Sequence, residues 1–101
     1  MAIQVNNISG NTAVELIDIN SGIHNINTMT IANTYSSLPV AVDLYLKNAS
    51  DTDYYIFKNL SIPIGQTLKL ESDEISFDNT VYNLYIKLAE GSDTVSVIIK
   101  Y

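Results

Sequence analysis

The residue most often used for acid–base chemistry occurs once in this chain, as His24 in a polar stretch between Gly22 and Asn25. A histidine acts as a general base when a nucleophile lies beside it and a third group orients its ring. The sequence has no cysteine and shows no serine–aspartate constellation that would serve His24. We therefore expect His24 to be an ordinary surface or strand residue.

The acidic residues gather in two stretches that could bind a cation or act as a pair. One turn holds Asp51 and Asp53, and a second stretch contains Glu71, Asp73, Glu74 and Asp78. Such oxygen ligands can bind calcium, and paired carboxylates can hydrolyse glycosides, but neither stretch has the EF-hand pattern and a small domain offers little room for a substrate groove. We interpret both as solvated loops, with calcium binding as the alternative, and predict no catalytic residue, no metal and no cofactor.

Charge and composition exclude several classes of partner. The formal net charge is −6, and the five basic residues are lysines scattered singly at positions 47, 58, 69, 87 and 100. Nucleic acids are bound by clusters of lysine and arginine, so we predict no nucleic-acid partner. The apolar runs are too short for a spanning helix, which predicts no membrane partner. The first residues lack the basic and apolar regions of a secretion signal, so we expect folding in the cytosol.

Alternating apolar and polar residues define the elements that position these side chains. Strict alternation predicts strands over residues 40–47, 82–88 and 95–101, with a shorter strand over 66–71. Residues 14–19 resemble a strand before an Asn-Ser-Gly turn, a further strand can lie within residues 22–32, and residues 3–8 are either an edge strand or an arm. The fold class expected is therefore an all-β, antiparallel β-sandwich or jelly-roll-like domain of about 7–8 strands. Residues 1–101 form one domain, with residues 1–10 as a possible N-terminal arm or edge strand.

An internal echo relates two parts of the chain. Residues 44–47, a Ser-Asp-Thr turn and residues 56–58 recur as residues 84–87, a second Ser-Asp-Thr turn and residues 98–100. We interpret the echo as two similar β-hairpins, with chance similarity in a low-diversity sequence as the alternative. If Val97 and Ile99 face the core, the same parity places Tyr55 and Phe57 inward, and residues 54, 56 and 58 outward.

This parity gives the domain a second, partly apolar face, because tyrosine and isoleucine would then point outward among the lysines. Tyrosine is enriched at protein interfaces, since its ring is apolar and its hydroxyl tolerates water. We predict that a partner covers this face, although single exposed apolar residues are also common. The candidate interface residues are Tyr45, Tyr54, Ile56, Tyr85 and Ile98.

The segment Ile62-Pro63-Ile64-Gly65-Gln66-Thr67-Leu68 predicts a crossing between sheets. Pro63 cannot donate to a central ladder, and Gly65 permits a tight turn into the next strand. This segment, the tyrosine-rich strand before it and the final strand pair ending at Ile99 resemble small virion structural proteins of tailed phages, in particular β-sandwich proteins of marine and cyanobacterial phages. The resemblance covers residues 40–101 and implies no catalytic residue.

What the resemblance implies is assembly in many copies on a virion. The leading hypothesis is a capsid decoration or cement subunit of a bacteriophage, made in the host cytoplasm and located in the virion, that bridges neighbouring capsid proteins. Its expected partners are the major capsid protein or another virion protein, and copies of itself in a homo-oligomer formed at sheet edges. The alternative is a carbohydrate- or receptor-binding module that stacks ligands on Tyr45, Tyr54 or Tyr85. An enzyme would be indicated by turnover that is lost on mutation of His24 or of Asp51 and Asp53.

Overall fold

The alternation seen in the sequence builds two sheets of four strands each. A computed structural model describes residues 2–23, 25–35 and 37–101. In chain order the elements are β1 (Ile3–Ser9), β2 (Val14–Ile17), β3 (Thr28–Asn33), β4 (Val40–Lys47), β5 (Asp53–Ile62), β6 (Thr67–Glu71), α1 (Ser72–Ile75), β7 (Asn83–Leu88) and β8 (Thr94–Lys100). No helix in these described ranges is long and apolar enough to cross a membrane.

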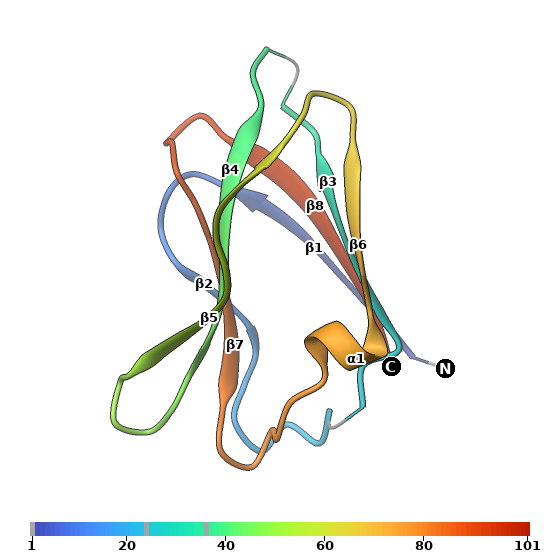
Figure 1. Cartoon of the computed structure of the whole chain (residues 1–101), viewed down its shortest axis with the longest axis vertical. Helices are drawn as coiled ribbons and strands as arrows, with labels where there is room; N and C mark the ends of the chain where they lie inside the picture. The colour runs from blue at the N-terminus through green and yellow to red at the C-terminus, as the bar shows by residue number, and fades with distance from the viewer. Residues whose placement is uncertain (1, 24, 36) are drawn as a thin grey trace.

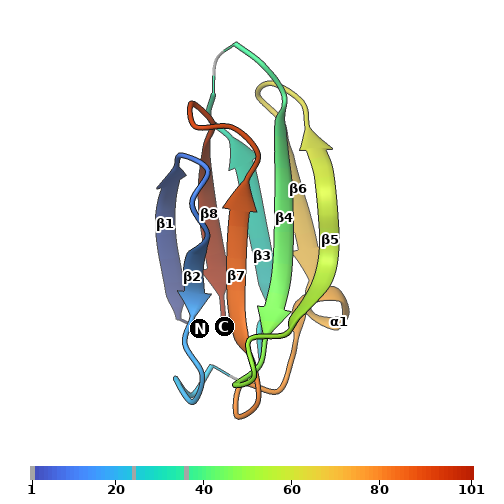
Figure 2. The same ribbon diagram turned by 90° about the vertical axis from the view of Figure 1, so that its left-hand side faces the viewer.

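The two sheets pack face to face: Figure 1 shows one layer beside the other, and Figure 2 looks through the sheet of β2, β7, β4 and β5 onto the sheet behind it. One sheet has the order β1-β8-β3-β6 and the other the order β2-β7-β4-β5, and every neighbouring pair is antiparallel. This interleaving of early and late strands is the order of an eight-stranded jelly roll. The prediction of an antiparallel β-sandwich or jelly-roll-like fold is confirmed.

The core lies between the two sheets, whose separate layers Figure 1 shows, and every second residue of the central strands fills it. Val40, Val42 and Leu44 of β4 are fully buried. The same holds, to within 1% exposure, for the inward residues of the other central strands: Met29, Ile31, Leu84, Ile86, Leu88, Val95, Val97 and Ile99. Each such side chain contributes about 1.5–3 kcal/mol of transfer free energy, so the core fixes which face of each strand points inward.

The interpretation of the echo as two hairpins is wrong for its second copy. The first copy is a hairpin, since β4 and β5 pair across the turn at Asn48–Thr52. In the second copy, β7 pairs with β2 and β4, whereas β8 pairs with β1 and β3 in the other sheet. The second Ser-Asp-Thr segment therefore crosses from one sheet to the other. Buried Asp93 closes that turn, because its carboxylate accepts the Glu90 N–H at 3.0 Å.

The parity expected along β5 is wrong for Tyr55. Two register shifts interrupt the pairing of β4 with β5, so that Leu44 lies opposite Phe57 and Tyr45 lies opposite Tyr55. Phe57 consequently packs against the core while Tyr55 lies on the outer face with Tyr45. Each bulge adds a residue that the partner strand lacks and so reverses the alternation. Ile56, expected outside, is half-buried against the core.

Residues 3–8, left open between an arm and an edge strand, lie within edge strand β1. The crossing predicted at Pro63 is also present, since it joins β5 of one sheet to β6 of the other. There the Gln66 N–H donates to the Pro63 carbonyl at 3.1 Å, and Gly65 adopts a φ of 71°. The second acidic stretch is partly helical, because Glu71 and Glu74 form a capping box at the start of α1.

Two buried asparagines hold the connecting loops. Asn79 is fully buried, donates to the Asp18 carbonyl at 2.7 Å, and accepts hydrogen bonds from the Ser21 hydroxyl at 3.0 Å and the Gly22 N–H at 3.1 Å. Asn33 donates to the Ile62 carbonyl at 2.9 Å and accepts the Tyr35 N–H at 2.8 Å. Asparagine suits both positions because its side-chain amide can donate and accept hydrogen bonds at the same time.

Candidate binding surface

Three tyrosines form a row across the outer face of the sheet β2-β7-β4-β5. Tyr45 of β4 lies between Tyr85 of β7 and Tyr55 of β5, and the register pairs it with both. The ring centroids of Tyr45 and Tyr85 are 5.6 Å apart with an interplanar angle of 21°, and those of Tyr45 and Tyr55 are 5.1 Å apart at 44°. We call Tyr45, Tyr55 and Tyr85 the tyrosine row. The position of the row follows from strand pairing and not from closeness in sequence.

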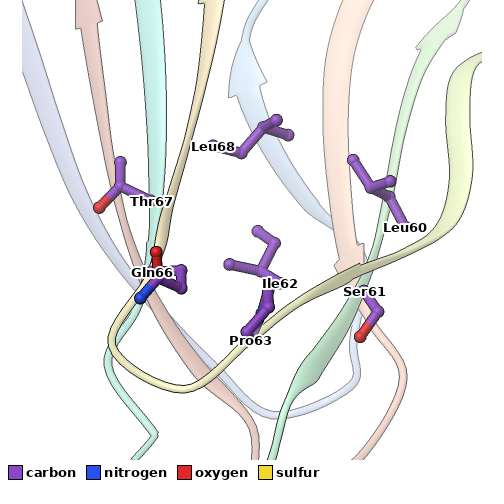
Figure 3. A pocket seen from close by; sticks show the side chains of 7 residues that line it. All are labelled: Leu60, Ser61, Ile62, Pro63, Gln66, Thr67 and Leu68. Atoms are coloured by element: carbon purple, nitrogen blue, oxygen red, sulfur yellow. The ribbon is translucent and has the colours of Figure 1, made fainter.

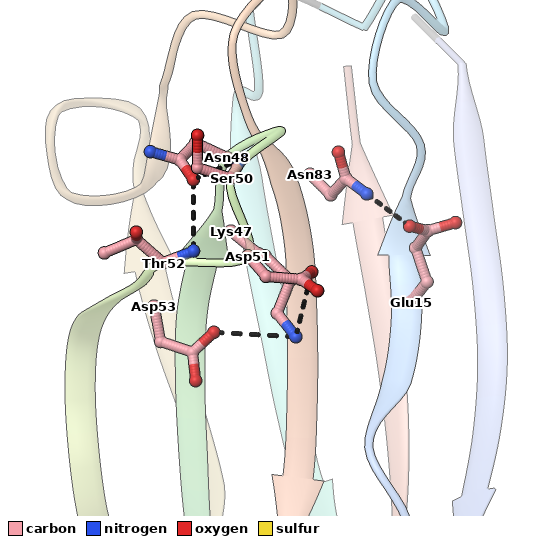
Figure 4. A network of polar contacts seen from close by, with 8 residues as sticks. All are labelled: Glu15, Lys47, Asn48, Ser50, Asp51, Thr52, Asp53 and Asn83. Carbon is pink, nitrogen blue, oxygen red and sulfur yellow. Dashed lines mark hydrogen bonds and ion pairs between the residues drawn. The ribbon is translucent and has the colours of Figure 1, made fainter.

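Two lysines lie over the outer rings of the tyrosine row. Lys47 Nζ is 5.1 Å from the centroid of Tyr85, and Lys58 Nζ is 4.9 Å from the centroid of Tyr55. Cation–π contacts of this kind contribute about 0.5–1 kcal/mol where they are exposed to water. Lys47 is also held at 3.6 Å by Asp53 and at 3.9 Å by Asp51 (Figure 4). Asp51 and Asp53, which were predicted to lie in one turn, thus flank Lys47 beside the tyrosine row.

Burial distinguishes Tyr45, at the centre of the tyrosine row, from its neighbours and sets the direction of its pKa shift. Tyr45 is only 5% exposed, whereas Tyr55 is 45% exposed. Burial raises the pKa of Tyr45 above its ordinary value of 10, because the phenolate would lose hydration, and the nearby negative charge of Asp53 raises it further. Tyr45 therefore stays neutral at physiological pH and supports its neighbours.

Polar side chains of β7 and β2 lie beside the Tyr85 end of the tyrosine row. Asn83 of β7 donates from Nδ2 to Glu15 Oε2 of β2 (Figure 4), while Asn83 Oδ1 is buried with no hydrogen-bond partner within the described part of the chain. Glu15 lies opposite Tyr85 in the register. The row is thus bordered by a carboxylate on one side and by Lys58 on the other, which is the apolar-centre and polar-rim arrangement of protein interfaces.

Several ring faces of the row are already covered within the molecule. Tyr45 stacks on Tyr85, and the cations of Lys47 and Lys58 lie over Tyr85 and Tyr55. A sugar or other flat ligand would have to displace these contacts in order to stack. The arrangement instead suits a partner that meets the ring edges, the hydroxyls and the lysine ammonium groups.

The predicted interface residues do not lie on one surface. Tyr45 and Tyr85 belong to the tyrosine row, whereas Ile98 lies on the outer face of the opposite sheet. Tyr54 is opposite Leu46, on the inward side near the end of the sandwich, and meets Tyr82 edge-on at 6.0 Å. Tyr55 was not among the predicted interface residues, since only the bulges of β5 reveal that its side chain points outward.

The remaining residues considered for chemistry are dispersed. His24 lies outside the described residues. Within the described ranges, no three histidine, cysteine, aspartate or glutamate residues are grouped as a metal site. Asp78 accepts hydrogen bonds from the Thr80 N–H and hydroxyl at 3.0 and 2.6 Å. Glu71 contacts Lys69 at 3.4 Å.

Two hollows lie apart from the tyrosine row. An apolar notch of about 140 Å³ sits at the crossing from β5 to β6, where Leu60, Ile62, Pro63 and Leu68 surround it (Figure 3). Ligand pockets usually measure about 300–1,000 Å³, so the notch has room for one side chain. A shallow depression of about 440 Å³ with a mixed polar and apolar lining lies among the loops that carry Asn20, Asn48 and Thr80.

Comparison with known proteins gives likenesses of fold only. No family model and no curated protein matches the chain. The mitogen of Yersinia pseudotuberculosis superposes over 97% of this chain and 81% of its own, with 15% identity and a TM-score of 0.48. A structure of the Gt strain of infectious bursal disease virus superposes over 97% of this chain and 31% of its own, with 13% identity and a TM-score of 0.37. The assignment as an eight-stranded antiparallel β-sandwich rests on the strand order and pairing of the chain itself.

Proposed function

We propose that this chain is a non-catalytic assembly module that binds a protein partner through the tyrosine row. In its specific form, the proposal is a decoration subunit of a tailed-phage capsid, made in the host cytoplasm, that binds the major capsid protein or a neighbouring virion protein. The tyrosine row is the observation that carries the proposal. It places one exposed, one partly exposed and one buried tyrosine on three adjacent strands.

The exposure of the row supports a protein partner over a sugar. Tyrosine contributes a large apolar area with few rotatable bonds, and its hydroxyl forms hydrogen bonds at the rim of an interface. In the row, Tyr45 is buried and serves as support, while Tyr55 is open to a partner. Because Lys58 lies over Tyr55, an acidic or carbonyl-rich partner surface would meet positive charge at that end of the row, whereas the charge of Lys47 is offset by Asp51 and Asp53.

The fold is compatible with the proposal without deciding it. Jelly rolls occur in viral capsid and lectin domains, and a fold hosts many functions. The resemblance of residues 40–101 to small virion proteins favours the capsid, and the occupied ring faces disfavour the lectin alternative.

Binding to particles tests the proposal with a matched pair of variants. Tyr54 and Tyr55 are adjacent and similarly exposed, at 50% and 45%, but only Tyr55 belongs to the row. Particles sedimented from the source culture are analysed for the chain by mass spectrometry. Particles stripped of it are then mixed with purified wild-type, Tyr55→Ser or Tyr54→Ser protein and sedimented again.

We expect the wild-type and Tyr54→Ser proteins to sediment with the particles and Tyr55→Ser to remain in the supernatant. A tyrosine at the hot spot of an interface typically contributes about tenfold or more to affinity. Absence of the chain from purified particles would refute the capsid proposal. Equal sedimentation of both variants would show that the row is not the docking surface, and specific binding to a glycan array would favour the alternative module.

A further inference from the structure

Strand β1 presents an unpaired edge with a defined set of backbone groups. Among the described strands it pairs with β8 alone. Ala2 and Tyr101 exchange both backbone hydrogen bonds, at 2.6 and 2.9 Å, and the Gly10 N–H donates to the Asp93 carbonyl at 3.1 Å. Antiparallel pairs alternate between bonded and non-bonded positions, so the even-numbered residues of β1 bond to β8. The N–H and C=O groups of Ile3, Val5 and Asn7 therefore point away from the sheet.

The other edge strands of the described sandwich carry features that hinder pairing with another chain. Strand β2 has only four residues, includes Glu15 and contains a bulge. Strand β5 contains two register shifts and a positive φ at Asn59, and β6 carries Lys69 and Glu71. Charges, bulges and short length are the usual protections of sheet edges.

Strand β1 lacks all of these protections. It is seven residues long, reads Ile-Gln-Val-Asn-Asn-Ile-Ser, and has no charge, no proline and no register shift against β8. Two of its outward side chains are apolar and strongly exposed, Ile3 at 60% and Val5 at 67%. Ile98 of β8 lies opposite Val5 and extends this apolar patch onto the next strand.

We propose that a second copy of this chain pairs with β1 through its own β1, which joins two four-stranded sheets into one continuous sheet across a two-fold axis (Figure 2 shows the free edge of β1). A two-fold axis places a strand antiparallel to itself, so the free groups of odd-numbered residues meet the same groups of the partner copy. The favoured register sets the two Val5 side chains opposite each other, with Ile3 on the same face.

Charge supports a second copy as the occupant. The chain has a formal net charge of −6, but neither β1 nor β8 contains an acidic residue, and Lys100 lies opposite Ile3. Two copies that pair through β1 therefore bring no carboxylates of these strands together. The inference does not depend on the proposed function, because the tyrosine row lies on the other sheet.

Sedimentation velocity of the purified chain tests the inference. The edge contact is smaller than a standard interface of about 1,600 Å², so we expect a weak dimer. The average mass should rise from 11.2 kDa toward twice that value as the protein concentration increases from about 10 μM to 1 mM. Val5→Lys places a charge on the edge, and Val5→Pro removes an N–H that β8 does not use. Both should weaken dimerisation about tenfold or more, whereas Thr67→Lys on the opposite edge strand should leave it unchanged.

A single-cysteine experiment identifies the contact directly, because the chain has no cysteine of its own. A short bismaleimide should crosslink the Val5→Cys protein into a dimer and should leave Thr67→Cys monomeric. A chain that stays monomeric to 1 mM would overturn the inference. So would a dimer that survives both Val5 substitutions while circular dichroism shows the folded β spectrum.

Discussion

Replacement of Asn79 by alanine tests whether one buried side chain holds the loop end of the sandwich. The Asn79 amide joins its own loop before β7 to the loop after β2, where its partners Asp18, Ser21 and Gly22 lie 57 to 61 positions earlier in the sequence. Alanine removes the donor and the acceptor together. The carbonyl of Asp18 and the N–H of Gly22 are then left to find water.

The expected cost follows from the three hydrogen bonds of 3.1 Å or less. Each contributes about 1 kcal/mol net, which sets an upper figure of about 3 kcal/mol. Asp18, Ser21 and Gly22 are exposed residues, so water replaces part of the loss. We therefore expect Asn79→Ala to lower the free energy of unfolding by about 2 kcal/mol.

Urea unfolding measured by circular dichroism gives this quantity. With a slope of about 1–2 kcal/mol per M, the midpoint should fall by about 1–2 M. Asn11→Ala, at an exposed position in the β1–β2 turn, is the control and should change stability by less than about 0.5 kcal/mol. A midpoint for Asn79→Ala that matches this control would refute the reasoning that Asn79 fastens the loops.

Two further substitutions test the electrostatics of the row and the turn at the sheet crossing. In the unfolded chain tyrosine ionises near pH 10, whereas the pKa of Tyr45 is raised in the folded state. The stability that Tyr45 contributes is therefore present below about pH 10 and lost as the pH rises through its folded pKa. In urea titrations between pH 9 and pH 11, Tyr45→Phe should therefore lose less stability than the wild type. Equal losses would contradict this prediction. Gly65→Ala should lower stability by about 1 kcal/mol, because Gly65 has a φ of 71° with no atom within 4 Å of an added Cβ. Gly91→Ala, where φ is not positive and the space is equally open, should be neutral or slightly stabilising. Thermal melts of both variants measure these changes, and identical changes for the two glycines would show that backbone strain is not the cause.

Local alternation predicted most of the strands, because the core imposes it directly. The apolar residues at positions 40, 42, 44 and 46 marked β4 with its observed bounds, and residues 83–88 and 94–100 were found within one residue of the predicted ranges. Pro63 and Gly65 also marked the crossing correctly, since their backbone restrictions act without long-range partners.

Long-range pairing was less accessible from the sequence. The resemblance of residues 84–100 to a hairpin was misleading, because a short turn can join two sheets as readily as two neighbouring strands. The same limit affected the site. The bulges of β5 arise from its pairing with β4, so the outward direction of Tyr55 could not be read from alternation alone. The role of Asn79 was equally hidden, because its partners are up to 61 positions away.

The interleaved strand order also bears on the order in which the fold can form during synthesis. Strand β1 is made before the other described strands, but its only neighbour among them is β8, with Ile3 opposite Lys100. The same late strand joins β1 to β3. By contrast, β4 and β5 are consecutive and can pair as soon as both are made. The sheet that bears the tyrosine row can therefore start from a local hairpin, whereas the opposite sheet stays divided until its last strand is translated.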